Sequence, residues 1–155
     1  MYTGSLYIAS DHGGYQLKKR LLRYLKNELS VSAEDLGPME FVPTDDYPDY
    51  AIPLAQKTVT EGGRGILICT NGIGVCIVAN KVKGARAGLG YNLEAAESMR
   101  RDDNANILCL AAKLSSDDHA MAIVKKWLET DFNSDGEKER YARRLKKIEE
   151  FENKL

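Results

Sequence analysis

Short apolar runs alternate with amphipathic segments along most of the chain. Residues 6–10, 66–68 and 107–110 are apolar runs of the length that buried parallel strands show. Two weaker runs, at 32–36 and 85–89, favour shorter strands, and glycine and proline residues end several of these segments. The pattern therefore predicts five strands.

The segments between these runs have helical periodicity. Leu17, Leu21 and Leu25 repeat at a spacing of four, and residues 120–128 place apolar side chains on one face. Further helices are expected after Pro48, over about 75–78 and over about 92–102. Strands that alternate with helices predict an α/β protein with a three-layer α/β/α, Rossmann-like five-stranded parallel sheet. At 155 residues, we expect one domain over 1–155.

The end of the chain departs from this rhythm. Residues 131–139 form a polar linker, and a helix over 140–154 carries a narrow apolar stripe. An isolated helix of this length is marginal in water, so we expect residues 131–155 to form a C-terminal helical arm that crosses to a second subunit. Arg140 and Arg144 lie four residues apart, on one helix face. Such a pair is usually solvated, but it also suits a phosphate group.

Composition narrows the class of protein. The chain has 22 basic and 23 acidic residues, so no charge excess favours a nucleic acid or a membrane surface as partner. We find no apolar run long enough for a membrane span and no signal peptide. Its three cysteines do not form a C-x-x-C motif, which argues against a disulfide scaffold or a zinc knuckle. These features predict a cytoplasmic protein.

The central strand ends at Cys69 and is followed by a glycine-containing turn and a short helix. Cys69 is thus expected at the carboxyl end of a parallel strand, where ligands bind in open α/β sheets. Gly72 and Gly74 let backbone N–H groups approach a ligand, and a thiol in this position is expected to be partly thiolate. The segment can hold a base or nucleophile that faces an anion hole, but a cysteine at a strand end is often only a core residue.

Two sharper interpretations of this turn are excluded. A tyrosine-phosphatase-like loop needs an arginine where this chain has Val75. A dinucleotide-binding fingerprint needs a third glycine where the chain has Ile77. The turn is therefore neither a phosphatase loop nor a nucleotide fingerprint.

Two more segments carry candidate chemistry. Asp11 and His12 follow the first strand, where Asp11 can cap the next helix and the His12 imidazole has room to meet an anion. Tyr47 precedes Pro48 at a helix start, and its hydroxyl can face a ligand or pack against the protein.

The chain resembles the type B ribose-5-phosphate isomerases, within the wider group that includes the galactose-6-phosphate isomerase subunits. The resemblance runs from Ile8 to Ile148. It rests on seven segments in order: Ser10-Asp-His-Gly-Gly-Tyr15, Asp46-Tyr-Pro-Asp-Tyr50, Gly65-Ile-Leu-Ile-Cys69, Gly72-Ile-Gly74, Ala79-Asn-Lys81, Gly84-x-Arg86-Ala87 and Asn104-Ala-Asn-Ile-Leu108.

The resemblance implies a cofactor-free and metal-independent aldose–ketose isomerase that forms homodimers, or dimers of dimers, with shared active sites. It assigns Cys69 as the base that moves a proton between C1 and C2 of the open-chain sugar through an enediolate. Asp102 is the other implied catalytic residue. The implied ligands of the sugar phosphate are Asp11, His12, Tyr47, Asn71, Gly72, Ile73, Gly74, Asn104, Lys113, Arg140 and Arg144. Four of these, His12, Lys113, Arg140 and Arg144, are implied to bind its phosphate group.

Two departures leave the preferred sugar open. Asn71 replaces a threonine of the family's anion hole, and Asp102 replaces the histidine thought to open the sugar ring. An aspartate is ordinarily ionised near neutral pH and therefore donates a proton poorly to the ring oxygen. Three explanations stay open: a neighbour such as His12 helps to open the ring, the substrate supplies enough open-chain form, or the preferred sugar is a different one. Ribose 5-phosphate and ribulose 5-phosphate are the expected substrates. The alternatives are a hexose-6-phosphate isomerase of the galactose/tagatose or allose type and a catalytically silent phosphosugar-binding protein.

Overall fold

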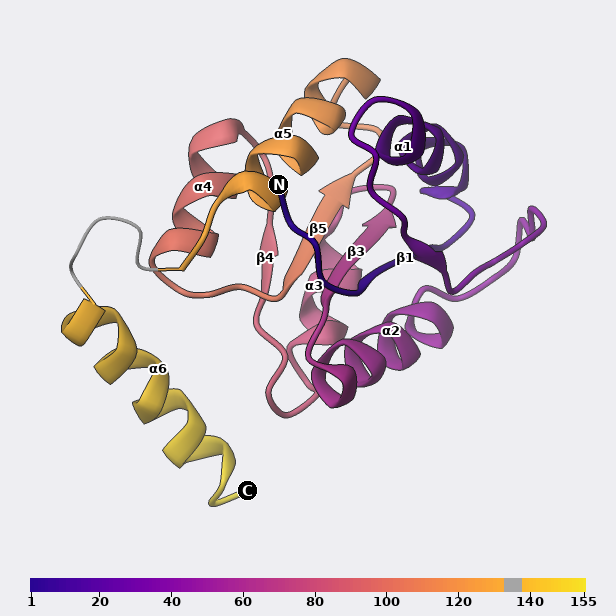
Figure 1. Cartoon of the computed structure of the whole chain (residues 1–155). Coiled ribbons are helices and arrows are strands. Elements are labelled where there is room, and N and C mark those ends of the chain that lie inside the picture. Colours follow the sequence, from indigo (N-terminus) through magenta and orange to yellow (C-terminus); the bar gives the residue numbers. More distant parts are fainter. Residues whose placement is uncertain (133–137) are drawn as a thin grey trace.

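The computed structural model describes residues 1–132 and 138–155, and its centre is a parallel sheet (Figure 1). The strands are β1 (Leu6–Ser10), β2 (Glu34–Asp35), β3 (Arg64–Cys69), β4 (Ala87–Leu89) and β5 (Ile107–Ala111). They are arranged in the order β2-β1-β3-β5-β4. The register pairs Ser10 with Ile68 and Cys69 with Ala111, so β1, β3 and β5 end at the same edge.

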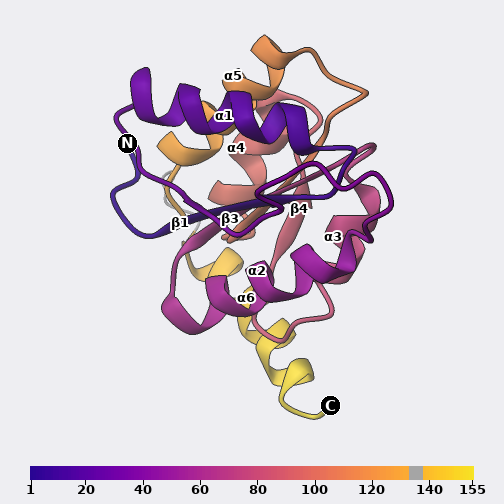
Figure 2. The ribbon, with the colours of Figure 1, turned by 90° about the vertical axis from the view of Figure 1, so that its right-hand side faces the viewer.

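Helices cover both faces of the sheet (Figure 2). The helices α1 (Tyr15–Asn27), α4 (Leu93–Arg101) and α5 (Asp117–Glu129) pack on one face, and α2 (Pro48–Glu61) and α3 (Ile73–Ala79) pack on the other. Alternate β3 residues divide between the two cores: Ile66 and Ile68 contact the first group of helices, whereas Leu67 and Cys69 contact the second. The molecule is therefore the expected three-layer α/β/α fold.

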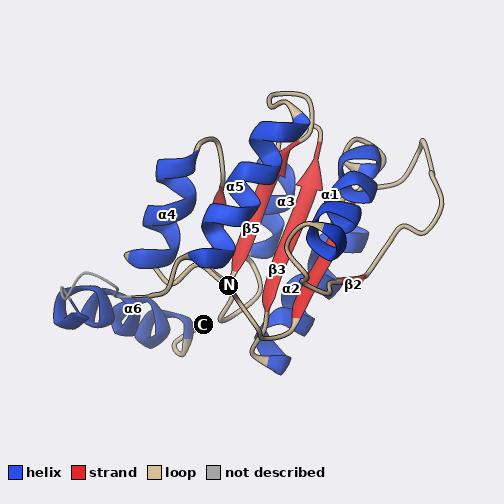
Figure 3. Cartoon of the chain, turned by 45° about the horizontal axis from the view of Figure 1, so that its top comes forward, coloured by secondary structure: helices blue, strands red, loops and turns tan. Residues whose placement is uncertain are grey.

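The last helix, α6 (Lys138–Glu152), lies apart from these layers (Figure 3). Its Tyr141 is buried, but Ile148 and Phe151 of the predicted apolar stripe are 47% and 62% exposed. The Gly84 N–H donates to both carboxylate oxygens of Glu152, at 3.2 and 3.1 Å, and so holds α6 beside the amino end of β4. In a single chain the stripe is thus largely uncovered.

Most element boundaries agree with the pattern in the sequence. β1 has the predicted bounds, and Asn92 and Ser116 cap α4 and α5 with side-chain oxygens that accept from Ala95 N–H and His119 N–H. The two weak strands are shorter than predicted, at two and three residues for β2 and β4. Part of the predicted linker, residues 133–137, lies outside the described residues.

Candidate active site

The strand order creates a crevice at the carboxyl ends of β1 and β3. The chain runs from β1 outward to β2, whereas β3, β5 and β4 lie on the other side of β1, which makes this the topological switch point. Asp11 follows β1, and its N–H donates to the Ile68 carbonyl at 3.3 Å. Cys69 is the next residue along β3. Two segments far apart in sequence therefore meet where a ligand is expected.

Cys69 lies at this edge with its side chain on the α2 and α3 side of the sheet. It is 5% exposed, and its Sγ accepts a hydrogen bond from the Gly72 N–H at 3.1 Å. The thiol also contacts the Asn71 Oδ1 at 3.7 Å. The Gly72 N–H therefore points at the sulfur, where it can stabilise negative charge that develops during proton transfer.

The turn after Cys69 has a conformation that requires glycine. Gly72 has φ of +74°, and a Cβ there would lie 2.5 Å from the Leu89 Cδ1. The Asn71 Oδ1 accepts from the Ile73 N–H at 3.0 Å and so occupies one of the turn's donors. A Cβ at Gly74 would lie 2.8 Å from the ring of Tyr47, which is therefore seated against the start of α3.

His12 is held by a residue that sequence analysis missed. Its Nδ1 lies 2.7 Å from the Asp45 Oδ1, and its backbone N–H donates to the same oxygen at 2.9 Å. The hydrogen bond to Asp45 raises the pKa of His12, which favours the imidazolium. Asp45 is 33 residues away, and its only signal was its place in an acidic loop before Pro48.

Asp11 is 5% exposed, and burial raises the pKa of its carboxyl group. Its Oδ1 accepts from the Gly14 N–H at 3.1 Å. Gly14 is the N-cap residue of α1, which has no side-chain cap, so Asp11 fixes the loop before the helix. A Cβ at Gly13 would collide with the Thr70 hydroxyl, which shows how closely this loop approaches the Cys69 turn.

Lys113 also belongs to this edge. The Ala112 N–H donates to the Cys69 carbonyl at 2.9 Å, and the Lys113 N–H donates to the Thr70 carbonyl at 3.0 Å. The segment after β5 therefore runs beside the Cys69 turn. Nine predicted site residues thus lie at the carboxyl edge of the sheet: Asp11, His12, Tyr47, Cys69, Asn71, Gly72, Ile73, Gly74 and Lys113.

The other four predicted residues lie at the opposite edge of the sheet. Asp102 and Asn104 precede β5, and Arg140 and Arg144 lie on α6, whose end is tied to Gly84 before β4. Arg144 acts electrostatically on Asp103, at the end of α4, which places the arginine-bearing end of α6 near that loop. β5 runs from one edge of the sheet to the other over five residues, and its four steps of about 3.3 Å separate the two edges by about 13 Å. One chain therefore does not bring its two groups of predicted residues together.

At this second edge, Asp102 and Asn104 are each held by a neighbouring arginine. Asp102 is paired with Arg101 through Nε–Oδ1 at 2.8 Å and Nη2–Oδ2 at 3.3 Å. Asn104 adopts φ of +47°, and its Oδ1 accepts from the Arg100 Nη1 at 2.9 Å. Arg140 and Arg144 lie over the Tyr141 ring, at 5.1 and 6.0 Å from its centroid.

The described residues contain neither a candidate metal site nor a membrane-spanning helix. No group of three or more His, Cys, Asp or Glu side chains among them is arranged to hold a metal ion. None of their helices is long and apolar enough to cross a membrane.

Comparison with known proteins gives consistent matches. The family model described as Ribose/Galactose Isomerase matches residues 6–148. The chain is 41% identical over 150 residues to a probable ribose-5-phosphate isomerase B of Mycoplasma genitalium, covering 96% of this chain and 95% of that protein. It is 32% identical to the ribose-5-phosphate isomerase B of Mycobacterium tuberculosis, covering 95% and 89%.

A solved structure is similar over the full length. The crystal structure of Mycoplasma genitalium ribose-5-phosphate isomerase B with bound ribulose 5-phosphate superposes with a TM-score of 0.91. The two sequences are 39% identical, and the match covers 100% of both chains.

Proposed function

The chain belongs to the ribose/galactose isomerase family, and we propose that Cys69 is the base with which it interconverts ribose 5-phosphate and ribulose 5-phosphate. It is a sugar-phosphate isomerase. The proposed substrate rests on the similarity of this chain, over its full length, to an isomerase with ribulose 5-phosphate bound. The observation that supports the base is the Gly72 N–H directed at the Cys69 sulfur.

The reaction transfers one proton between neighbouring carbons. The Cys69 thiolate removes the proton from C2 of the open-chain aldose, which forms an enediolate. A proton passes from O2 to O1 of the enediolate, and the resulting thiol returns a proton to C1, which leaves the ketone at C2. Gly72 stabilises the sulfur and Ile73 donates to Asn71, so we assign the enediolate oxygen to the N–H groups of Asn71 and Gly74. One such donor contributes about 3 kcal/mol to transition-state stabilisation.

We propose that the protonated His12 binds the phosphate group, because Asp45 favours its charged form and 40% of its side chain is exposed to meet a ligand. Asp11 and Tyr47 line the same crevice and are assigned to the sugar hydroxyls. Asp102, paired with Arg101, accepts a proton from the O1 hydroxyl more readily than it donates one to the ring oxygen.

We propose that two copies of the chain form each active site. The support is the separation of the predicted residues onto opposite edges of the sheet, together with the exposed stripe of α6. In a homodimer, α6 of one subunit would bury its Ile148 and Phe151 side chains and bring Arg140 and Arg144 to the partner's crevice. We also propose a cytoplasmic location, which the three free cysteines support.

The function is tested with purified protein and a panel of pentose and hexose phosphates. We expect ribose 5-phosphate and ribulose 5-phosphate to give the highest kcat/KM, and solvent deuterium to enter the product at the carbon that receives the proton. A higher kcat/KM for a hexose 6-phosphate would show that the proposed pentose phosphates are not the preferred substrates. Binding of sugar phosphates without turnover or deuterium incorporation would contradict the isomerase function.

A further inference from the structure

A polar cavity of about 380 Å³ lies at the amino edge of the sheet, away from the Cys69 crevice. It opens between the start of β3, the segment before β4 and the end of α4. The described lining contains three arginines and no acidic residue: Tyr2, Thr58, Val59, Gly62, Gly63, Arg64, Gly84, Arg86, Arg100, Asn104 and Asn106. A cavity of this volume is large enough for a small ligand.

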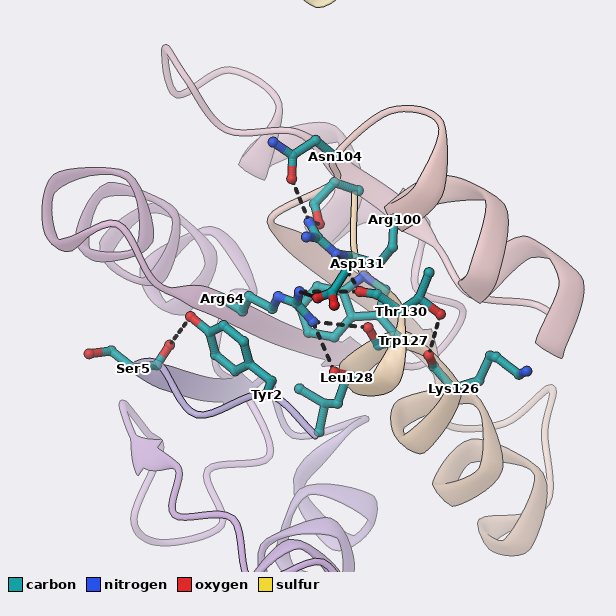
Figure 4. A network of polar contacts seen from close by, with 11 residues as sticks. Tyr2, Ser5, Arg64, Arg100, Asn104, Lys126, Trp127, Leu128, Thr130 and Asp131 are labelled. Atoms are coloured by element: carbon teal, nitrogen blue, oxygen red, sulfur yellow. Dashed lines mark hydrogen bonds and ion pairs between the residues drawn. The ribbon is translucent and has the colours of Figure 1, made fainter. Parts of the chain in front are cut away.

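The three arginines come from different elements and crowd together. Arg64 and Arg100 are only 5% and 6% exposed, and Figure 4 shows their side chains converging beside Asp131. Burial, and then the charges of Arg64 and Arg86, lower the pKa of Arg100 to about 10. Arg100 is still a cation at neutral pH, so the cluster concentrates positive charge in a water-poor place.

Arg64 has a structural role that accounts for most of its donors. Its Nη1 donates to the carbonyls of Trp127 and Leu128 at 3.1 and 3.2 Å, and its Nη2 donates to Thr130 at 3.3 Å. These carbonyls end α5, so Arg64 caps that helix. Its charge contributes to the cavity, but its hydrogen bonds are largely used.

Arg86 and Arg100 retain unused donors. Arg86 donates from Nε to the Asn104 carbonyl and from Nη1 to Gly84, and Arg100 donates from Nη1 to Asn104 and Ala105. Within the described part of the chain, neither Nη2 group makes a hydrogen bond. Two guanidinium groups that line the same cavity therefore have donors left for a ligand.

Nearby carboxylates lie outside the lining and do not fill the cavity. Asp131 approaches the Arg64 Nη2 at 3.8 Å, but its side chain is 89% exposed. Glu149 and Glu152 of α6 act on Arg86 from the neighbouring groove. These acids leave the Nη2 groups of Arg86 and Arg100 without a hydrogen bond among the described residues.

We propose that this cavity is a second anion site that binds a small oxyanion, either inorganic phosphate or the phosphate group of a monoester. Guanidinium groups suit phosphate because their planar N–H donors match its oxygens, and the buried setting strengthens each charge-assisted hydrogen bond. The lining contains none of His12, Lys113, Arg140 and Arg144, so its residues differ from those proposed to bind the phosphate of the substrate.

The test is calorimetric titration of the full-length protein with inorganic phosphate at constant ionic strength. In parallel, phosphate inhibition of the isomerase reports the substrate site alone. We expect two phosphate sites per chain. Arg86→Gln should weaken one of them at least about tenfold and leave the inhibition constant unchanged, because it removes a charged donor from the cavity. Glycerol 3-phosphate, in a separate titration, distinguishes a site for monoesters from one for free phosphate only.

Two further variants keep the result decisive if Arg86→Gln disturbs folding. Arg86→Lys keeps the charge but loses the planar fork, and Arg100→Lys makes the same change at the second guanidinium of the cavity. Each should weaken the second site while circular dichroism and the inhibition constant stay as in the natural protein. A single phosphate site per chain, or a second site that none of the three variants weakens, would overturn the proposal.

Discussion

The polar partners of the site residues decide what each residue can do, and the partner of His12 is distant in sequence. Cys69 could be placed from the sequence because an apolar run, a turn and two glycines are local signals. Asp45 could not, because its contact with His12 depends on how a 33-residue segment folds back. Three predictions concern single residues.

The His12–Asp45 pair predicts a pH dependence of substrate binding. His12 has a raised pKa because of Asp45, so it stays protonated to higher pH and loses its charge as pH rises through that value. Asp45→Asn should lower the pKa of His12, and KM for ribose 5-phosphate should then begin to rise at lower pH than in the natural protein. The measurement is KM against pH, with Asp46→Asn as the control. Identical profiles for Asp45→Asn and the natural protein would refute the role of Asp45.

Cys69 and Cys76 are expected to respond differently to substitution. Cys69→Ala should reduce kcat by about 10²–10⁴-fold and leave phosphosugar binding largely intact, because it removes only the base. Cys76 donates to the Ala87 carbonyl at 3.4 Å within the α3 core. Cys76→Ala should therefore cost about 1 kcal/mol of unfolding free energy and little kcat. Steady-state kinetics measures kcat, and urea unfolding measures the unfolding free energy. If Cys69→Ala keeps most of its activity, Cys69 is not the base and Asp11 is the next candidate.

The Asp102 position tests whether ring opening limits the reaction. A histidine there can donate a proton to the ring oxygen, whereas an aspartate paired with Arg101 is a poor donor. Asp102→His should raise kcat/KM for ribose 5-phosphate by about tenfold or more, and Asp102→Asn should not. If Asp102→His gives no gain, the open-chain sugar or another acid such as His12 suffices.

At the scale of elements, periodicity gave the type and approximate bounds of each helix and strand, but not which strands are neighbours. The insertion of β5 between β3 and β4 depends on long-range packing that no local pattern encodes. The weak strands were predicted too long because only part of each apolar run finds a pairing partner. The turn between β3 and α3, however, was readable from its glycines.

This turn predicts a specific effect of Gly72→Ala. Gly72 is in the left-handed region, and an added Cβ would press on Leu89, so the change should cost about 1–3 kcal/mol of unfolding free energy. It should also reduce kcat, because it shifts the N–H that contacts the Cys69 sulfur. Gly62→Ala is the matched control, with φ of +70° and no atom within 4 Å of the added Cβ. Urea unfolding and kcat should separate them, and an equal kcat in both variants would contradict the role of the turn.

At the scale of the whole molecule, the sheet keeps the two groups of site residues apart within one chain. The sequence predicted the members of both groups, but the separation follows from strand direction: Cys69 ends β3, whereas Asp102 and Asn104 precede β5. The exposed Ile148 and Phe151 of α6 leave an apolar surface uncovered in a single chain. In the proposed homodimer, a second copy of the chain would cover this surface and receive Arg140 and Arg144 at its site.

The most direct test of this shared site mixes two inactive proteins, Cys69→Ala and Arg140→Ala/Arg144→Ala, under conditions that exchange subunits. If α6 crosses to the partner, every mixed dimer has one site with an intact Cys69 and intact arginines. Half of the dimers are mixed at equal concentrations, so about a quarter of the natural activity should return. If mixed dimers form and the activity stays absent, each α6 serves its own subunit and the shared site is wrong.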